Sequence, residues 1–240
     1  KFLKTSARQD GAYYIVNGEK AYLTNGPIAD HFIVLAITDE TEGKKAFSAI
    51  LVPADSEELE RTEGVKIDFL HPCPHGGIRL KDCKVGTENL IGKAGDAFAR
   101  TSMRMRAIED AVGAGGSVGA FQCLLNDIAS VAPRERALEI GAIGTQLQLL
   151  DVGATHLAKM VENESGDHAP TMELQLGFHQ QCQTICKAFA TLIEDLPSPL
   201  TTEINLLNRD IAKSLTIARS THAVRLTKIG HSIQKLSQHP

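Results

Sequence analysis

The stretch from Tyr13 to Gly26, YYIVNGEKAYLTNG, decides the expected fold because it places two turn signals and two strand signals in one short segment. Asn17-Gly18 is a dipeptide that readily supplies the two positive φ angles of a tight type I′ turn. β-forming residues flank it, Tyr14-Ile15-Val16 before and Ala21-Tyr22-Leu23-Thr24 after, and Asn25-Gly26-Pro27 follows as a stop. The stretch therefore predicts a β-hairpin with its turn at Asn17-Gly18.

The chain continues outward from this hairpin as short strands. Phe32–Ile37, FIVLAI, is a continuous apolar run typical of a strand buried on both faces, and the charged turn TDETEGKK follows it. Further strands are expected at Ala46–Val52, which Pro53 ends, at Val65–Phe69, and at Gly77–Val85, where apolar and polar residues alternate. Short strands closed by Gly, Pro and Asp turns predict a small β-barrel or sandwich domain over residues 1–90.

The sequence changes character near Asn89, and residues 91–240 predict helices. Phe98–Ala132 contains no proline and has apolar residues at helical spacing, which predicts one long helix. Three more helices follow after short connections, so the four are expected to form an antiparallel four-helix bundle. These helices are Phe98–Ala132, Pro133–Glu162, Thr171–Leu196 and Thr201–Leu236, with a loop at Asn163–Pro170 and a break at Pro197-Ser198-Pro199. The expected fold class is α+β, a β-domain followed by a bundle.

Composition excludes several classes of protein. The 240 residues carry a formal charge of −4 without a Lys/Arg cluster, so no nucleic-acid partner is expected. No apolar run reaches the roughly 18 to 20 residues of a membrane span, so no membrane partner is expected. The chain has five cysteines and no CxxC pair, which favours a reducing compartment, either the cytoplasm or a mitochondrial matrix. Cys182 and Cys186, one helical turn apart, are interpreted as small buried apolar residues.

Three segments carry a resemblance to a known family. Lys4–Gly26, KTSARQDGAYYIVNGEKAYLTNG, closely resembles the middle β-domain of the acyl-CoA dehydrogenase family. Ile78–Gly92 resembles the family's strand-and-linker signature, with Gly86 where the family usually has proline, and Ile211-Ala212-Lys213 is similar to an Ala-Lys pair of its fourth helix. A β-domain followed by a four-helix bundle is the order of the last two domains of such an enzyme.

The resemblance implies a function and its partners. The expected activity is FAD-dependent introduction of an α,β double bond into an acyl-CoA thioester, with electrons passing to an electron-transfer flavoprotein. It also implies a homo-oligomer, a dimer or tetramer formed through the bundle helices. The second helix carries a wide apolar face that fits such an assembly, made of Ile140, Ile143, Leu147, Leu149, Leu150, Val152 and Leu157.

The same resemblance implies the cofactor contacts. In the family the hairpin ends beside the flavin ring, which would give Thr24 a hydrogen bond to the flavin's polar edge and make Tyr22 the aromatic neighbour of the ring. Leu23 stands between them where the family usually has isoleucine. The alternative interpretation is an ordinary strand that ends at an Asn-Gly turn.

Glu109 is the candidate catalytic base. It lies six residues before Gly115 in RAIEDAVGAGGSVGA, a spacing similar to that of a branch of the family that includes isovaleryl-CoA dehydrogenase. Abstracting the α-proton of a thioester requires a carboxylate in a water-poor pocket. The alternative is that Glu109 is a solvated helix residue beside Asp110.

Departures from the family pattern motivate a second hypothesis. The stretch RERALEIGAIG lacks a counterpart of the Arg-x-x-Phe-Gly motif that contacts the FAD diphosphate, and Arg225–Ser232, RLTKIGHS, only partly matches the Gln-x-x-Gly-Gly-x-Gly stretch. The family's N-terminal helical domain and its Tyr-Glu-Gly-Thr segment are also missing from the chain, which is expected to be a fragment that binds FAD weakly. The alternative function is a degenerate or truncated subunit that retains the fold for assembly and has lost flavin.

Two further motifs are interpreted structurally. Gly113–Gly119, GAGGSVG, is similar to a dinucleotide fingerprint but lies in a helix pattern with no preceding strand, so close helix packing is expected instead. His71, Cys73 and His75 alternate along HPCPH without an evident fourth ligand, so a proline-rigid loop is expected there and no metal site.

Overall fold

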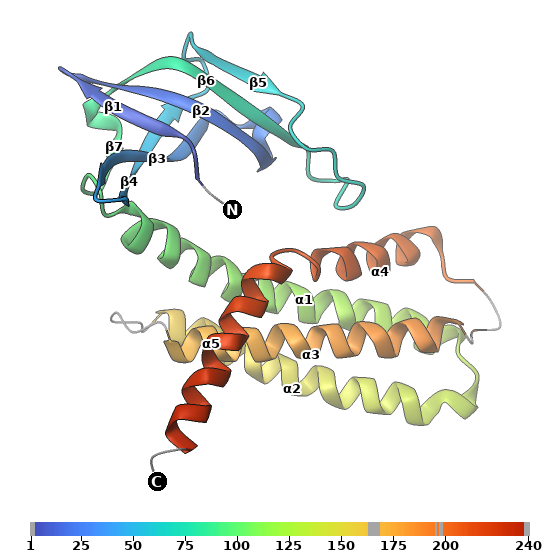
Figure 1. Cartoon of the computed structure of the whole chain (residues 1–240). Helices are drawn as coiled ribbons and strands as arrows, with labels where there is room; N and C mark the ends of the chain where they lie inside the picture. Colours follow the sequence, from blue (N-terminus) through green and yellow to red (C-terminus); the bar gives the residue numbers. More distant parts are fainter. Residues whose placement is uncertain (1–2, 163–168, 195, 197–198, 238–240) are drawn as a thin grey trace. The chain divides into compact units, whose positions relative to one another are not determined.

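The computed structural model describes residues 3–162, 169–194, 196 and 199–237, and the chain divides into two compact units, Lys1–Met105 and Arg106–Pro240 (Figure 1). The boundary between the units, at Met105 and Arg106, lies later in the chain than the change in sequence character near Asn89. The reason is that the π-helical turn Phe98–Met103 belongs with the strands, since the rings of Phe98 and Phe47 pack with their centroids 5.8 Å apart. The α+β class predicted from the sequence is confirmed.

The first unit is one mixed seven-stranded sheet in the order β5-β6-β2-β1-β3-β4-β7. Only β1 and β3 pair in parallel; the other neighbours are antiparallel. The strands are β1 Ser6–Asp10, β2 Tyr13–Thr24, β3 His31–Thr41, β4 Lys44–Pro53, β5 Leu59–Thr62, β6 His75–Gly86 and β7 Leu90–Ile91. Buried residues from both halves of the sheet, such as Val16 of β2 and Val34 of β3, form a single cluster, so the sheet curls around one core.

Strand β3 shows how that core is lined. Phe32, Val34 and Ala36 are buried in it, whereas Ile33 between them is 58% exposed. A strand at Phe32–Ile37 is therefore confirmed, but its expected burial on both faces is wrong within this unit, because alternate side chains point to opposite faces and only one face meets the core.

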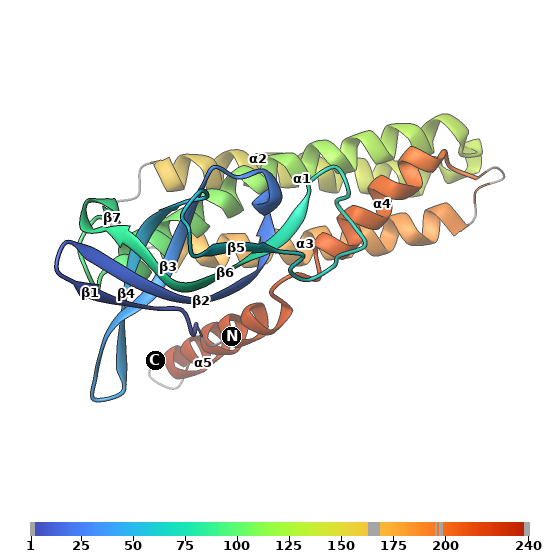
Figure 2. The same cartoon turned by 90° about the horizontal axis from the view of Figure 1, so that it is seen from above.

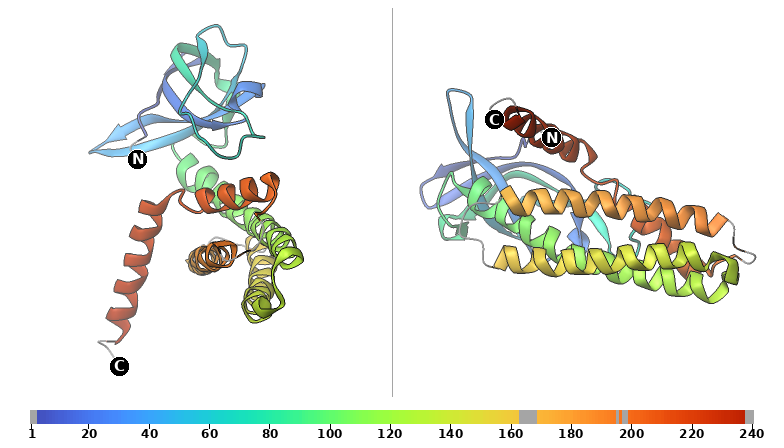
Figure 3. Two further views of the ribbon diagram at one scale, coloured as in Figure 1. Left: turned by 90° about the vertical axis from the view of Figure 1, so that its right-hand side faces the viewer. Right: turned by 90° about the horizontal axis from the view of Figure 1, so that it is seen from below.

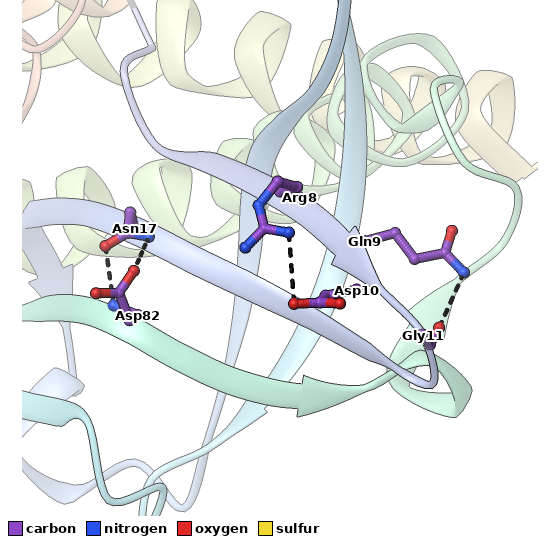
Figure 4. A network of polar contacts seen from close by, with 6 residues as sticks. All are labelled: Arg8, Gln9, Asp10, Gly11, Asn17 and Asp82. Carbon is purple, nitrogen blue, oxygen red and sulfur yellow. Dashed lines mark hydrogen bonds and ion pairs between the residues drawn. The ribbon is translucent and has the colours of Figure 1, made fainter.

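The predicted hairpin turn at Asn17-Gly18 is wrong. Strand β2 runs without interruption from Tyr13 to Thr24, and the hairpin is formed instead by β1 and β2, which are joined at Gly11 and Ala12 and paired from Asp10 with Tyr13. Gly11 has φ +58°, which suits the first central position of a type II′ turn. Side chains of β1 border this turn, with an Arg8–Asp10 ion pair and a hydrogen bond from Gln9 to the Gly11 carbonyl (Figure 4).

Asn17 and Gly18 form part of a β-bulge and not of a turn. The pairing of β2 with β6 shifts at this point, and Asp82 of β6 adopts φ +50°. The side chain of Asn17 spans the irregularity: its Nδ2 donates to Asp82 Oδ1 over 3.0 Å, and its Oδ1 accepts from the Asp82 amide over 2.9 Å (Figure 4). Gly18, at φ +148°, lies directly against Thr5, whose Cα would be 2.8 Å from an added Cβ. The pair that resembled a turn therefore joins β2 to β6 and to Thr5, the residue that precedes β1.

Of the remaining strand predictions, some are confirmed and one is wrong. The turn in TDETEGKK is confirmed at Glu42 and Gly43, both with positive φ, and β4 ends at Pro53 as expected. Val65–Phe69 forms no strand, and β5 lies earlier, at Leu59–Thr62. Gly64 explains the difference, because its φ of +63° interrupts the extended backbone between Thr62 and Val65.

The second unit contains helices α1 Arg104–Val131, α2 Ala137–Glu162, α3 Ala169–Glu194, α4 Thr202–Ser214 and α5 Arg219–Ser237. The first three predicted helices are confirmed, and α1, α2 and α3 lie side by side (Figure 2). Phe121 of α1 stacks on Phe189 of α3 in their common core. No helix in the described part of the chain is long and apolar enough to span a membrane.

Both predicted interruptions fall largely outside the described residues. Of the expected loop Asn163–Pro170, residues 163–168 lie outside them, and the last two residues already belong to α3. Proline is tolerated there because the first turn of a helix has no intrahelical use for its N–H group. Of the predicted break Pro197-Ser198-Pro199, only Pro199 is described, and it is not helical.

The predicted fourth helix is two helices. The chain turns between Leu215 and Ala218, and Ala218 has φ +59°, which ends the α-helical path. The hydroxyl of Thr216 donates to the Lys213 carbonyl, so the side chain takes up an acceptor at the helix end. Helix α4 packs on the common core through Ile204 and Ile211, whereas α5 leaves the direction of the other helices (Figure 3).

Two histidines connect α5 to α3. The rings of His179 and His222 meet edge to face with centroids 4.4 Å apart. Gln183 Nε2 lies 3.2 Å from His179 Nε2, and because an amide nitrogen only donates, this ring nitrogen accepts and carries no proton. Burial lowers the pKa of both imidazoles, and for His222 the charges of His179, Arg106 and Arg225 lower the pKa further while Asp110 opposes them.

We predict that Gly18→Ala destabilises the sheet unit by roughly 1–3 kcal/mol, because the added methyl group must displace the backbone of Thr5. Gly43→Ala is the matched control: its φ is also positive, at +75°, but no atom lies within 4 Å of the added carbon. Urea unfolding of both variants measures the difference. A Gly18→Ala cost no larger than that of Gly43→Ala would contradict the close approach.

We also predict that the helical unit loses stability in weak acid. The folded-state pKa values of His179 and His222 are lowered, so the unfolded chain binds more protons once the pH falls through the unfolded value of about 6.5. Their contribution should be intact above that value and decline as the pH falls toward the folded-state pKa. Urea unfolding followed by helical circular dichroism should show this decline, and His222→Gln should reduce it. His231→Gln, an exposed position on the same helix, should leave it unchanged.

Candidate functional site

The end of strand β2 presents two of the three predicted cofactor residues on one face. Tyr22 is 60% exposed and Thr24 is also exposed, and residues two positions apart on a strand share a face. Leu23 packs in the opposite direction, against the core of the sheet. The structure thus places Tyr22 and Thr24 on the same face. On that face Leu23 presents only backbone atoms, because its side chain lies in the core.

His75 fixes the hydroxyl of Thr24. The two residues pair across β2 and β6, and Thr24 Oγ1 lies 3.2 Å from His75 Nε2. Asn25, which follows, donates its amide to the Pro74 carbonyl over 2.7 Å. From the sequence, His75 was considered only as a metal ligand. The sequence places His75 just before a predicted strand, but only the strand register of the folded protein shows that it lies opposite Thr24.

A hollow of about 400 Å³ lies in the same region, formed by the segment between β5 and β6. The residues that line it are Glu63, Val65, Lys66, Ile67, Phe69, His71, Cys73, Pro74 and His75. His71, Cys73 and His75 therefore border one hollow. Within the described ranges, no three His, Cys, Asp or Glu side chains are grouped closely enough to hold a metal ion.

Glu109 lies in the second unit, at a pocket of about 230 Å³ formed between α1, α3 and α5. Glu109 itself is exposed. The pocket is lined by Glu109, Asp110, Gly113, Ala114 and Ser117 of α1, Leu157 of α2, Gln175, Leu176, Phe178, His179 and Cys182 of α3, Ser214 of α4, Leu215, and His222 and Arg225 of α5. The candidate base thus borders a pocket that is lined by both apolar and polar side chains.

Charged side chains from separate helices lie near one another beside this pocket, although Arg106 is not among the residues that line it. Arg106 Nε lies 3.8 Å from Asp110 Oδ2, one turn apart on α1. Asp110 and Arg106 also act electrostatically on Arg225 of α5. Sequence reasoning missed Arg225, which lies in the stretch interpreted as a partial nucleotide motif, and it missed His179 and His222 altogether. No spacing could have revealed the group, since its members come from three helices.

Cys182, which lines the pocket, has an unreactive thiol near neutral pH. Burial raises the pKa of the Cys182 thiol to about 12 and that of Cys186 to about 11, so neither is a thiolate near neutral pH. Cys182 is fully buried and Cys186 half-buried, which fits their interpretation as apolar core residues. All five cysteines are free.

The glycine run of α1 has no packing partner within the unit. Gly113–Gly119 lies inside a continuous helix, so it forms no phosphate loop. A Cβ added at Gly113, Gly115, Gly116 or Gly119 would meet no described atom within 4 Å. The expected close helix packing at these glycines is therefore wrong for the described part of the chain, because all four positions are exposed on α1.

Comparison with known proteins gives a consistent match. Residues 1–83 match the model of the acyl-CoA dehydrogenase middle domain. Cyclohex-1-ene-1-carbonyl-CoA dehydrogenase of Syntrophus aciditrophicus is 35% identical over 97 residues, which are 40% of this chain and 23% of that protein. The caffeyl-CoA reductase-Etf complex subunit CarC of Acetobacterium woodii is 24% identical over 196 residues, 77% of this chain and 52% of that protein. The chain thus spans about half or less of these relatives' lengths.

Solved structures show the same fold over nearly the whole chain. The prolyl acyl carrier protein oxidase AnaB superposes with a TM-score of 0.80 at 23% identity, covering 95% of this chain and 64% of that one. Butyryl-CoA dehydrogenase from Megasphaera elsdenii superposes with a TM-score of 0.73 at 20% identity, covering 96% and 63%. The order of a β-domain followed by helices is therefore that of these enzymes, and residues 1–83 are a middle domain of the acyl-CoA dehydrogenase family.

Proposed function

We propose that this chain acts in an FAD-dependent oxidoreductase that introduces an α,β double bond into an acyl-CoA thioester. The observation that carries the proposal is the pair Tyr22 and Thr24, which stands exposed on one face at the end of β2, within the segment that matches the family's middle domain. Relatives named as acyl-CoA dehydrogenases, such as the short-chain enzyme of Clostridium acetobutylicum at 32% identity over 100 residues, support it.

The residues at the end of β2 fit a flavin. A planar ring needs an exposed aromatic or apolar surface beside it, which Tyr22 offers, and a hydrogen-bonding group at its polar edge, which Thr24 offers. His75 restricts the orientation of the Thr24 hydroxyl, so this group is positioned before the cofactor arrives. When bound, FAD would accept the hydride that leaves the β-carbon of the thioester. Leu23 would contribute its backbone, since its side chain lies in the core.

Glu109 is proposed to take the α-proton. Of the two adjacent carboxylates on α1, Asp110 is engaged by Arg106, whereas Glu109 faces the pocket and makes no ion pair within the described residues. Ile108 and Val112 beside it are 43% and 72% exposed, so an acyl group that covers this part of α1 would exclude water from the carboxylate. A dry surrounding is what raises the basicity that proton abstraction requires.

The partners follow from the same assignment. We propose an acyl-CoA as substrate and an electron-transfer flavoprotein as electron acceptor; the relative in Acetobacterium woodii is itself named as a subunit of a reductase-Etf complex. The five free cysteines support a reducing compartment, the cytoplasm or a mitochondrial matrix.

A subunit role in assembly is the second candidate function. The predicted apolar face of α2 divides in the structure: Ile143, Leu147, Leu150 and Leu157 are buried and Ile140 packs against their core, while Leu149 and Val152 are 68% and 67% exposed. Leu138, outside the predicted face, is a third exposed apolar residue of α2, at 82%. These three positions, i, i+11 and i+14, fall along one stripe of the helix. An exposed apolar stripe favours burial against another copy of the chain, as a dimer or tetramer.

We predict that the protein takes up added FAD and that Glu109→Gln lowers turnover of an acyl-CoA by the flavin-loaded protein by roughly 10² to 10⁴ without changing flavin content, because glutamine retains the size but cannot accept the proton. Thr24→Val should weaken flavin binding by roughly 0.5–1.5 kcal/mol. Visible absorbance measures the flavin, and reduction of an artificial electron acceptor measures turnover.

Glu135→Gln, on the exposed turn before α2, is the matched control for charge and should retain full turnover. Retained turnover in Glu109→Gln would place the base elsewhere. A colourless protein that fails to take up added FAD would favour the assembly role instead.

We predict that the protein forms oligomers whose mass is a multiple of 25.9 kDa and that Leu149→Glu with Val152→Glu shifts it toward the monomer. Two carboxylates on the stripe would have to be buried without partners in the interface. Gln148→Glu adds charge to an exposed position off the stripe and should leave the mass unchanged. Light scattering of the three proteins decides; a monomeric parent protein would contradict the assembly.

A further inference from the structure

Helix α5 takes no part in the core that joins the other helices. From Arg219 to Lys235, the part of α5 whose burial is described, no residue is buried. The core cluster of the unit and the apolar residues packed against it include Ile204, Ile211 and Leu215 but no described residue of α5. The chain turns after Leu215, and α5 then runs in a direction of its own (Figure 3). Helix α4 is therefore held by the core, whereas α5 depends on contacts outside it.

Two imidazoles and one amide make the contact of α5 with α3. His222 of α5 meets His179 of α3 edge to face, with the ring centroids 4.4 Å apart. Gln183, one turn after His179, directs its Nε2 to two acceptors, His179 Nε2 at 3.2 Å and the Leu215 carbonyl at 3.3 Å. The amide thus joins α3 to the end of α4 and to the histidine that receives α5.

This arrangement does not accommodate a second proton on His222. Its Nδ1 is inaccessible to solvent and has no hydrogen-bond partner among the described residues. An imidazolium donates from both ring nitrogens, so protonation would leave a charged N–H at Nδ1 without an acceptor. Burial of a charged donor without a partner is unfavourable. The docked position of α5 therefore favours a neutral His222.

His179 is restricted in the same way. Its Nε2 faces the amide nitrogen of Gln183, which only donates, so a proton on this ring nitrogen would set two donors against each other. A turned amide would offer its oxygen to the imidazolium, but that oxygen would then also face the Leu215 carbonyl, and the bond at 3.3 Å would be lost. The neutral ring is again the form that fits.

The surrounding charges act mainly in the same direction. Burial, followed by the charges of His179, Arg106 and Arg225, lowers the pKa of His222, and the Asp110 carboxylate opposes them. Burial also lowers the pKa of His179, against a hydrogen bond to the Leu215 backbone and the charge of Asp110. The titratable and charged groups around the two rings are Arg106, Glu109 and Asp110 of α1, Cys182 of α3 and Arg225 of α5.

We propose that His179, Gln183 and His222 form a pH-sensitive latch, which holds α5 against α3 while both rings are neutral and releases α5 when they are protonated. An unconstrained histidine is half protonated near about pH 6.5, so the latch holds above that value and opens as the pH falls below it. Release is a local event, because the core shared by α1, α2, α3 and α4 contains no described residue of α5. Since α5 supplies His222 and Arg225 to the pocket that Glu109 lines, its release opens one side of that pocket.

Hydrogen–deuterium exchange of the whole protein at about pH 7.5 and about pH 5.5, corrected for intrinsic exchange rates, tests the latch. Most helical stability in proteins comes from tertiary packing, so a released α5 should lose its protection against exchange. We expect this protection to fall by about tenfold or more at the lower pH, which corresponds to a preference of one pKa unit for the released state. The amides of α1 and α3 should change by less than about twofold.

Two variants and a matched control identify the groups responsible. His222→Phe retains an aromatic ring against His179 but cannot take up a proton, so α5 should keep most of its protection at the lower pH. Gln183→Glu offers a protonated His179 an acceptor and should also reduce the loss. His231→Phe makes the same change as the first variant at an exposed position of α5, and it should lose protection as the parent protein does.

The outcomes distinguish release of α5 from unfolding of the unit. A joint loss of protection in α1, α3 and α5 would show global unfolding and overturn the latch, as would protection of α5 that does not change with pH. A loss that persists in both His222→Phe and Gln183→Glu would assign the acid effect to other groups and overturn the proposal as well. If α5 of His222→Phe is unprotected even at about pH 7.5, the exchange of Gln183→Glu decides alone.

Discussion

The long pairing of β2 with β6 is the interaction on which the sheet unit depends. Strand β2 pairs with β1 on one side and with β6 along most of its length on the other, so an error in its register would misplace three strands at once. The Asn17–Asp82 hydrogen bonds and the contact of Gly18 with Thr5 fix that register at the bulge. The end of the same strand then carries Tyr22 and Thr24, and the opposite strand supplies His75. The proposed flavin contacts are therefore positioned by the pairing that organises the sheet.

Sequence patterns predicted the elements better than their connections. Alternation and apolar spacing located β3, β4, β6 and the first three helices, because these patterns follow from burial of one face. Asn17-Gly18 was misread because positive φ suits a tight turn and a bulge alike, and only the partner strand distinguishes them. The fourth helix was misread because no proline or glycine marks the turn at Leu215–Ala218. Local preference carries no signal where tertiary contacts determine the path.

The candidate site was predicted in the same uneven way. Tyr22, Thr24 and Glu109 were proposed through a family resemblance, which depends on contiguous sequence. His75 was overlooked as the partner of Thr24, and Arg225 with His222 was overlooked as the neighbour of Asp110, because each contact joins segments distant in the chain. The structure also changes the meaning of Leu23, since its side chain belongs to the core. Residues that act through long-range contacts become visible only when the topology is known.

The two ends of the sheet affect the behaviour of the protein in concentrated solution. An unpaired strand edge offers backbone N–H and C=O groups to other chains and so invites fibrous association. Here the two edge strands offer few backbone groups for pairing with another chain. Strand β7 has two residues, and β5 is Leu59–Thr62 with the charged Glu60 and Arg61 at its centre. A neighbouring chain that tried to extend the sheet would find a short register and would have to bring its backbone past charged side chains. Growth of the sheet from molecule to molecule is thereby discouraged.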